Sequence, residues 1–202
     1  MLNKYNLEFC FKGSRTYVQG PDIFDAVIDR LKNDFDKEKI SNIKYAGHEM
    51  LHANADMIVT ESFDKGNYSK INSVITFKYE YKKYFIVISE NDDKIECSNQ
   101  YTEEIVRSKS NIDEMIITFE NELMDSITEI IVSMNKYFLQ EIVTKDGKWI
   151  VTKFEYVKLI SLDYIKNKQL KLELTNNFNN KLTKSKIFVD DELVGYLYFS
   201  LI

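Results

Sequence analysis

The chain contains few of the residues that commonly mark a chemical site: two cysteines, two histidines and one proline among 202 residues. Cys10 and Cys97 lie far apart in the sequence and form no C-x-x-C pair. Two such isolated cysteines are an unusual framework for a secreted protein of this length. We therefore expect reduced thiols, no disulfide and a cytoplasmic location.

The sequence also lacks a long apolar run and an excess of positive charge. Its beginning, MLNKYNLEFCFKG, alternates polar and apolar residues and has no apolar centre of a signal peptide. No uninterrupted apolar stretch approaches the roughly 20 residues of a membrane helix. Acidic residues outnumber basic ones, 32 to 27, which leaves no basic surface for phosphate backbones. We expect neither a membrane nor a nucleic acid as a partner.

What the chain does contain is enough apolar material for a large core, since 44% of its residues are hydrophobic and 13% are aromatic. Residues 7 to 18 alternate in the manner of a strand. Gly20-Pro21 then opens a stretch, residues 20 to 35, whose apolar positions recur every three or four residues and predict a helix. Residues 71 to 91 predict two long strands that turn near Lys82 and Lys83.

The second half repeats this order of a helix followed by strands. Residues 124 to 143 predict the strongest helix of the chain, residues 148 to 160 and 170 to 178 predict strands, and Asp190-Asp191 marks the turn of a closing hairpin. Residues 59 to 89 can also be aligned with residues 172 to 201, which pairs Phe63 with Phe178 and Ser73 with Ser185. Internal duplication is the economical explanation of both observations.

Both histidines lie in one motif, H-E-x-x-H, at residues 48 to 52. On a helix, this spacing presents two imidazoles as zinc ligands, with Glu49 as the general base of a metallopeptidase. From Ile43 to Val59, however, apolar residues fall mainly on alternate positions, which predicts a strand. On a strand, His48 and His52 would stand about 13 Å apart, too far to share one metal ion. We therefore expect no metal site.

One strand, a long helix with an apolar stripe and a run of antiparallel strands form an α+β pattern in which the sheet wraps around the helix. Occurring in residues 1–100 and again in 101–202, this order resembles a tandem hot-dog protein. That fold is shared by acyl-CoA thioesterases and 3-hydroxyacyl thioester dehydratases. The resemblance covers nearly the whole chain and rests on the order and length of the elements. It implies that a thioester of coenzyme A or acyl carrier protein binds where two hot-dog units meet, that no cofactor is needed, and that a homodimer is compatible with the fold.

In this family, the catalytic groups lie in the loop before the central helix and on the first turns of the helix from the partner unit. These positions correspond here to SRTYVQGPDIFD. The resemblance implies catalytic roles for Tyr17, Gln19 and Asp22 and substrate contacts for Arg15, Phe24 and Val27. A dehydratase would have a histidine in this loop, whereas this chain has Gln19-Gly20-Pro21, which disfavours dehydration. A carboxylate at a helix start can orient or activate water, as a thioesterase requires. A carboxylate at this position also interacts favourably with the helix dipole, which explains its presence without any catalytic role.

The matching segment of the second half, FENELMDSITEII, offers Glu120, Glu122 and Asp125 and again no histidine. The Gly20-Pro21 entry favours the first half as the site, because a pre-organised turn lets backbone N–H groups approach a substrate carbonyl. Three functions stay open: an enzyme acting on acyl thioesters, a hot-dog-like module that binds or assembles without catalysis, and, least favoured, the zinc peptidase.

Overall fold

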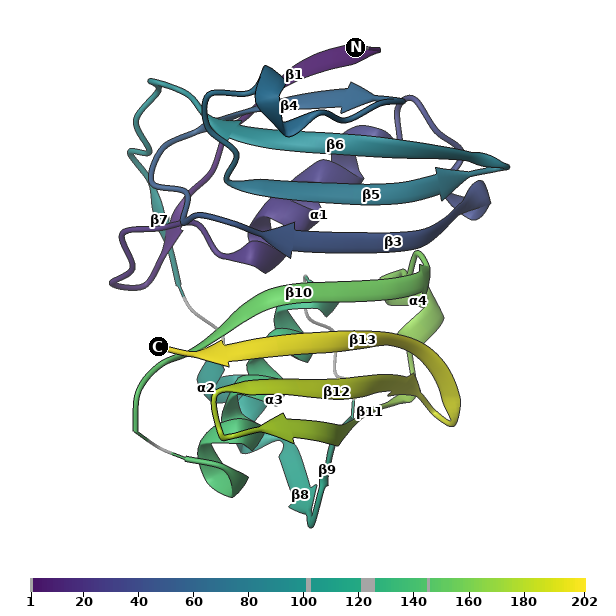
Figure 1. Ribbon diagram of the computed structural model, residues 1–202. Coiled ribbons are helices and arrows are strands. Elements are labelled where there is room, and N and C mark those ends of the chain that lie inside the picture. Colours follow the sequence, from purple (N-terminus) through teal and green to yellow (C-terminus); the bar gives the residue numbers. More distant parts are fainter. Residues whose placement is uncertain (1, 101–102, 121–125, 145) are drawn as a thin grey trace. The chain divides into compact units, whose positions relative to one another are not determined.

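The computed structural model describes residues 2–100, 103–120, 126–144 and 146–202. They divide into two compact units, one within Met1–Tyr101 and the other within Thr102–Ile202. Each unit consists mainly of an antiparallel sheet and one long helix (Figure 1). The predicted α+β class is therefore confirmed. The assignment of residues 1–100 and 101–202 as two hot-dog domains stays a prediction.

The sheet of the first unit has the strand order β1-β4-β6-β5-β3, and all neighbouring strands are antiparallel. Its strands are β1 (Asn3–Leu7), β3 (Ile40–Gly47), β4 (Ala55–Thr60), β5 (Ser73–Tyr79) and β6 (Lys82–Glu90). Two short strands, β2 (Phe11–Lys12) and β7 (Ser98–Asn99), form a separate parallel pair. Single 3-10 turns, η1 (Lys37–Lys39) and η2 (Lys65–Asn67), lie in the connections before β3 and β5.

Helix α1 (Gly20–Leu31) lies behind the strands of the first sheet in the view of Figure 1. It follows an extended Gln19 and has a proline in its first turn, where the missing N–H costs no helical hydrogen bond. Its buried residues are Pro21, Ile23, Phe24, Val27 and Leu31. The helix is shorter than predicted, because Phe35 leaves it to pack edge-on against the rings of Phe77, Tyr79 and Tyr84.

The strand predicted over residues 7 to 18 is wrong in its bounds. The chain stays extended beyond β1, and Phe9 is as buried as Leu7. The amide of Phe9, however, donates to the side-chain Oδ1 of Asn54 at 2.8 Å instead of to a neighbouring strand. The alternation of apolar residues therefore reflects burial on one side of the chain without continued pairing in the sheet.

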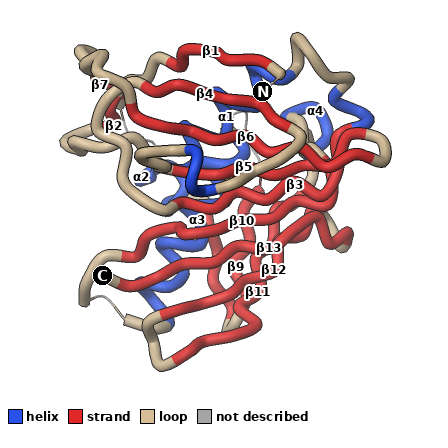
Figure 2. Tube along the Cα trace, turned by 45° about the horizontal axis from the view of Figure 1, so that its top comes forward, coloured by secondary structure: helices blue, strands red, loops and turns tan. Residues whose placement is uncertain are grey.

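The second unit has the strand order β10-β13-β12-β11-β9-β8, again antiparallel. Its elements are α2 (Glu103–Ser108), β8 (Ser110–Asp113), β9 (Ile116–Glu120), α3 (Ile127–Ile142), β10 (Trp149–Lys158), α4 (Leu162–Ile165), β11 (Gln169–Phe178), β12 (Leu182–Val189) and β13 (Glu192–Leu201). Helix α3 packs against the strands of its own unit (Figure 2). Its N-cap is Ser126, whose Oγ accepts a hydrogen bond from the Glu129 amide at 3.0 Å.

The long strands and hairpins predicted from the sequence are confirmed. The strands predicted over residues 148 to 160 and 170 to 178 are β10 and β11, and the closing hairpin turns at Asp190-Asp191. The hairpin of the first unit turns at Glu80-Tyr81, next to the predicted position. Glu80 and Asp190 both adopt the left-handed conformation, with φ of 55° and 52°, which a tight hairpin turn requires.

The two sheets differ in how the chain visits their strands. In the second unit, β11, β12 and β13 follow one another as direct neighbours. In the first unit, β4 pairs with β6, so the connection from β4 to β5 passes over β6. This longer connection carries Phe63 and Tyr68, which pack against the buried cluster of Ile71, Val74 and Val87. The strands matched by the sequence alignment occupy different places in the two sheets. The sheets therefore do not establish internal duplication, which stays a prediction.

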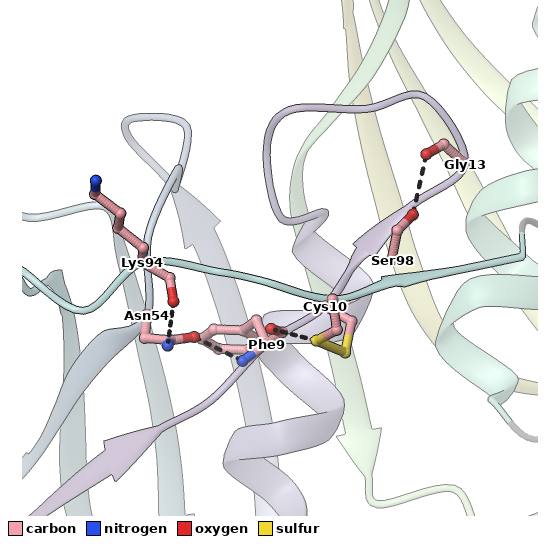
Figure 3. The surroundings of a disulfide bond; sticks show 7 residues. Phe9, Cys10, Gly13, Asn54, Lys94 and Ser98 are labelled. Atoms are coloured by element: carbon pink, nitrogen blue, oxygen red, sulfur yellow. Dashed lines mark hydrogen bonds between the residues drawn. A yellow bond between two sulfur atoms is a disulfide. The ribbon is translucent and has the colours of Figure 1, made fainter.

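The expectation of reduced cysteines is wrong, because Cys10 and Cys97 form a disulfide with Cα atoms 4.8 Å apart (Figure 3). The parallel pairing of β2 with β7 places Phe11 opposite Ser98, which brings the preceding cysteines together. The separation of 87 residues in the sequence argued against a disulfide, but the fold places the two cysteines next to each other. The cytoplasmic location therefore stays a prediction without support from the cysteines. No helix of the described residues is long and apolar enough to cross a membrane.

The H-E-x-x-H motif lies neither on a helix nor within a strand. Residues 48 to 54 form the loop between β3 and β4, interrupted only by an isolated bridge at Leu51. The strand predicted through Glu49 is therefore wrong at this point, and the zincin helix is wrong as well. Within the described part of the chain, no group of three or more His, Cys, Asp or Glu side chains is placed to hold a metal ion.

Candidate functional site

The predicted site residues lie in the loop before α1 and in α1 itself. The loop between β3 and β4 packs against the loop before α1. Val18 and Leu51 form an antiparallel bridge, in which the Val18 amide donates to the Leu51 carbonyl at 2.8 Å. Both side chains are buried. Tyr17 precedes this bridge in the chain, and His52 follows it.

His52 joins the two loops through its side chain. Its Nδ1 lies 2.7 Å from the carbonyl oxygen of Thr16. A carbonyl oxygen only accepts, so Nδ1 carries the hydrogen and the lone pair of the neutral ring is on Nε2. His52 is an exposed residue.

The backbone of His52 is held by a carboxylate. Its amide donates to Oε2 of Glu90 at 2.7 Å, and Oε1 of Glu90 pairs with Nζ of Lys70 at 3.2 Å. Partial burial works to raise the pKa of the Glu90 carboxyl, but the hydrogen bond from the His52 amide and the Lys70 ammonium outweigh it. The pKa of Glu90 consequently lies below its ordinary value.

Asn72, which is completely buried, fixes the rest of the loop between β3 and β4. Its carboxamide donates to the Met50 carbonyl at 2.9 Å and accepts from the Glu90 amide at 2.8 Å. Its backbone carbonyl accepts from the amides of His48 and Glu49 at 2.9 and 3.1 Å. One buried side chain thus satisfies several backbone groups that the irregular loop would otherwise leave unpaired.

The first turn of α1 contains the carboxylate singled out from the sequence. Oδ1 of Asp22 lies 2.6 Å from Nζ of Lys12, and both side chains are mostly buried, with exposed fractions of 17% and 15%. Lys12 belongs to β2 and follows Cys10 by two residues. The ion pair therefore connects the start of the helix to the segment that the disulfide holds in place.

The disulfide segment is fixed by further contacts on both of its strands. Ser98 donates from Oγ to the Gly13 carbonyl at 3.2 Å, and the Gly13 amide donates to the Asn99 carbonyl at 2.9 Å. Asn54, at the end of the loop between β3 and β4, donates to the Lys94 carbonyl at 3.3 Å (Figure 3). The loop before α1 is consequently bordered by two segments that are themselves anchored.

Gly20 allows the ring of Tyr45, on β3, to reach the start of α1. A Cβ atom at Gly20 would lie 3.1 Å from the Tyr45 hydroxyl oxygen. Tyr45 is buried, and burial raises the pKa of its hydroxyl, opposed by a hydrogen bond with Ser73. The hydroxyl therefore stays protonated at neutral pH, beside the first turn of the helix.

The structure places the remaining predicted residues as follows. Arg15, Tyr17 and Gln19 are half-buried in the loop before α1, whereas Phe24 and Val27 are buried, at 4% and 0% exposure. In the second unit, Glu120 ends β9, while Glu122 and Asp125 lie outside the described residues. The sequence interpretation missed Lys12 and His52 as neighbours of this loop, since both arrive from other elements. The only signal in the sequence for the place of His52 was the alternation of polar and apolar residues around it.

No family model matches the sequence, and no curated protein matches it. Solved structures do match its fold. A candidate thioesterase II from Thermobifida fusca has a TM-score of 0.55 at 7% identity, with 99% of this chain and 92% of that chain covered. The pyran synthase domain from module nine of the sorangicin pathway has a TM-score of 0.56 at 5% identity, with coverages of 98% and 94%.

A monomeric dehydratase domain from a trans-AT polyketide synthase split module matches with a TM-score of 0.52 at 10% identity, and both chains are covered completely. At such low identities these likenesses bear on the fold alone. They confirm the hot-dog fold that the order of elements predicted.

Proposed function

We propose that this protein binds acyl thioesters of coenzyme A or acyl carrier protein and hydrolyses them. The observation that supports this most is the fold match over 98 to 100% of the chain to a candidate thioesterase II and to dehydratase and pyran synthase domains. Because one fold hosts many activities, the assignment must also agree with the chemistry of a site.

Hydrolysis fits the loop before α1 better than dehydration does. The loop itself has no histidine, and the first helical turn offers the carboxylate of Asp22, held by Lys12 at 2.6 Å. In this proposal, Asp22 orients the attacking water, Tyr17 and Gln19 donate hydrogen bonds to the thioester, and Arg15 pairs with phosphate groups of coenzyme A. The apolar face of α1 around Phe24 and Val27 borders the acyl chain.

The resemblance to tandem hot-dog proteins suggests where the ligand lies. We propose that the pantetheine-linked acyl chain binds where two hot-dog units meet, with its thioester at the start of α1. Crosslinking tests this placement. An acyl-CoA with a photoreactive group in its acyl chain should label residues of both units, and labelling confined to one unit would contradict it.

The function is tested by binding and by thiol release. An acyl-CoA that binds only the native state at about 100 times its Kd adds roughly 2.7 kcal/mol to the free energy of unfolding and raises the melting temperature. Both cysteines of the chain are in the disulfide, so a thiol reagent detects only the coenzyme A released. Asp22→Asn should slow thiol release while preserving the thermal shift, because the two side chains have nearly the same size.

A module that binds without catalysis is the second candidate, and the Lys12–Asp22 ion pair favours it. A carboxylate already paired with an ammonium has its charge satisfied inside the protein and needs no catalytic role to explain its position. The two functions give different results in the same experiment. Thermal stabilisation by acyl-CoA without thiol release supports the binding module, and the absence of both refutes the thioester assignment.

A further inference from the structure

The proposed hydrolysis needs a proton acceptor, and the loop before α1 does not itself contain a good one. Asp22 carries a carboxylate whose Oδ1 is 2.6 Å from the Lys12 ammonium. This carboxylate is already paired with a cation, and in the proposed function it orients the attacking water. An imidazole is better suited to accept a proton near neutral pH.

The fold brings an imidazole to this loop from elsewhere in the chain. His52 follows Leu51, which forms an antiparallel bridge with Val18 of the loop before α1. Its Nδ1–H donates to the Thr16 carbonyl at 2.7 Å, which fixes the ring tautomer and leaves Nε2 as the acceptor.

The position of His52 is fixed by its surroundings before any ligand binds. Its amide is held by Glu90 at 2.7 Å, and Asn72 holds both Met50 on one side and the Glu90 amide on the other. A base that is positioned in advance loses little freedom when the substrate arrives, which is a condition for efficient catalysis. His52 is nevertheless an exposed residue.

We infer that His52 is the general base of the proposed thioester hydrolysis. Nε2 removes a proton from a water molecule as its oxygen attacks the thioester carbonyl carbon. When the carbon–sulfur bond breaks, the sulfur leaves with the bonding electron pair and receives the proton from the imidazolium. One water is consumed, and one carboxylic acid and one thiol are formed. The inference rests on the proposed function and names the base that this function requires.

The first test separates the effect of losing the base from the effect of losing the hydrogen bond to Thr16. In His52→Asn, the side-chain amide can still donate to the Thr16 carbonyl, but no acceptor nitrogen occupies the position of Nε2. We expect the rate of thiol release at saturating acyl-CoA to fall about 100-fold or more, with the same thermal shift from a non-hydrolysable acyl-CoA thioether. His48→Asn, in the same loop, is the matched control and should keep the wild-type rate.

Chemical modification provides a second readout that does not depend on the folding of a variant. The chain has two histidines, so in His48→Asn diethyl pyrocarbonate can carbethoxylate only His52 among imidazoles. Thiol release should disappear in step with this modification and return after treatment with hydroxylamine, and the thioether analogue should protect the ring.

The outcomes distinguish this inference from the proposed function. If the wild-type protein binds acyl-CoA and releases no thiol, the proposed hydrolysis fails, and the assignment of a base fails with it. If the wild-type protein is active and either His52→Asn or the carbethoxylated protein keeps the full rate, the proposed function stands and the role of His52 is refuted.

Discussion

Replacing Cys10 and Cys97 by serine should destabilise the first unit substantially. The disulfide joins residues 87 positions apart. In the chain-entropy description, closing a loop of this size in the unfolded chain stabilises the folded state by about 4.6 kcal/mol at room temperature. Residual structure in the unfolded chain reduces this value. We therefore expect the double variant to lose between about 2 and 5 kcal/mol in free energy of unfolding.

Urea unfolding can assign this loss to one unit. The only tryptophan, Trp149, is buried on β10 of the second unit, so its fluorescence follows that unit. Far-UV circular dichroism follows both units. If the disulfide acts within the first unit alone, the dichroism transition shifts to lower urea in the double variant while the Trp149 transition stays in place.

Two results would refute this reasoning. Wild-type protein unfolded without reductant could react with a thiol reagent at two cysteines, which would show that the disulfide is absent. Alternatively, the double variant could unfold at the same urea concentration as the wild type by both probes. A parallel shift of both probes would instead show that the two units unfold cooperatively.

Three further changes test the packing and the loop contacts. Gly195→Ala places a Cβ in steric conflict with the Glu155 carbonyl oxygen, so β10 and β13 must separate. We expect the free energy of unfolding in urea to fall by about 1 to 3 kcal/mol, and an unchanged midpoint would contradict the close approach. Ser126→Ala removes the N-cap of α3 and should cost about 1 kcal/mol, whereas Ser126→Asp should restore most of it. Because the pKa of Glu90 is lowered in the folded protein, its contribution is present above the unfolded pKa and disappears as the pH falls through the folded one. Glu90→Gln should therefore reduce the loss of stability between about pH 6 and pH 3, and an identical pH dependence would disprove this.

The helices could be predicted because their signals are local. In α1 and α3, apolar residues recur every three or four positions, and the first turns contain a proline and a serine cap, respectively. These features determine the local conformation before any distant segment is in place. The end of α1 could not be predicted in the same way, because Phe35 continues the apolar spacing but packs among aromatic rings of β5 and β6.

The candidate site was only partly readable from the sequence. The resemblance placed Tyr17, Gln19 and Asp22 in the loop before the helix and in its first turn, and the structure has these elements there. The partner of Asp22 could not be predicted, because Lys12 lies on a two-residue strand with too few positions to show a periodicity.

The sequence by itself determined the α+β class, the long helices and the hairpins, because their patterns repeat over neighbouring residues. Only the tertiary structure decided that β6 lies between β4 and β5, that Cys10 meets Cys97, and that His52 meets Thr16. The last two contacts join residues 87 and 36 positions apart. Contacts across such distances are produced by the pairing of strands and the burial of the core, and a local stretch of sequence contains no record of them.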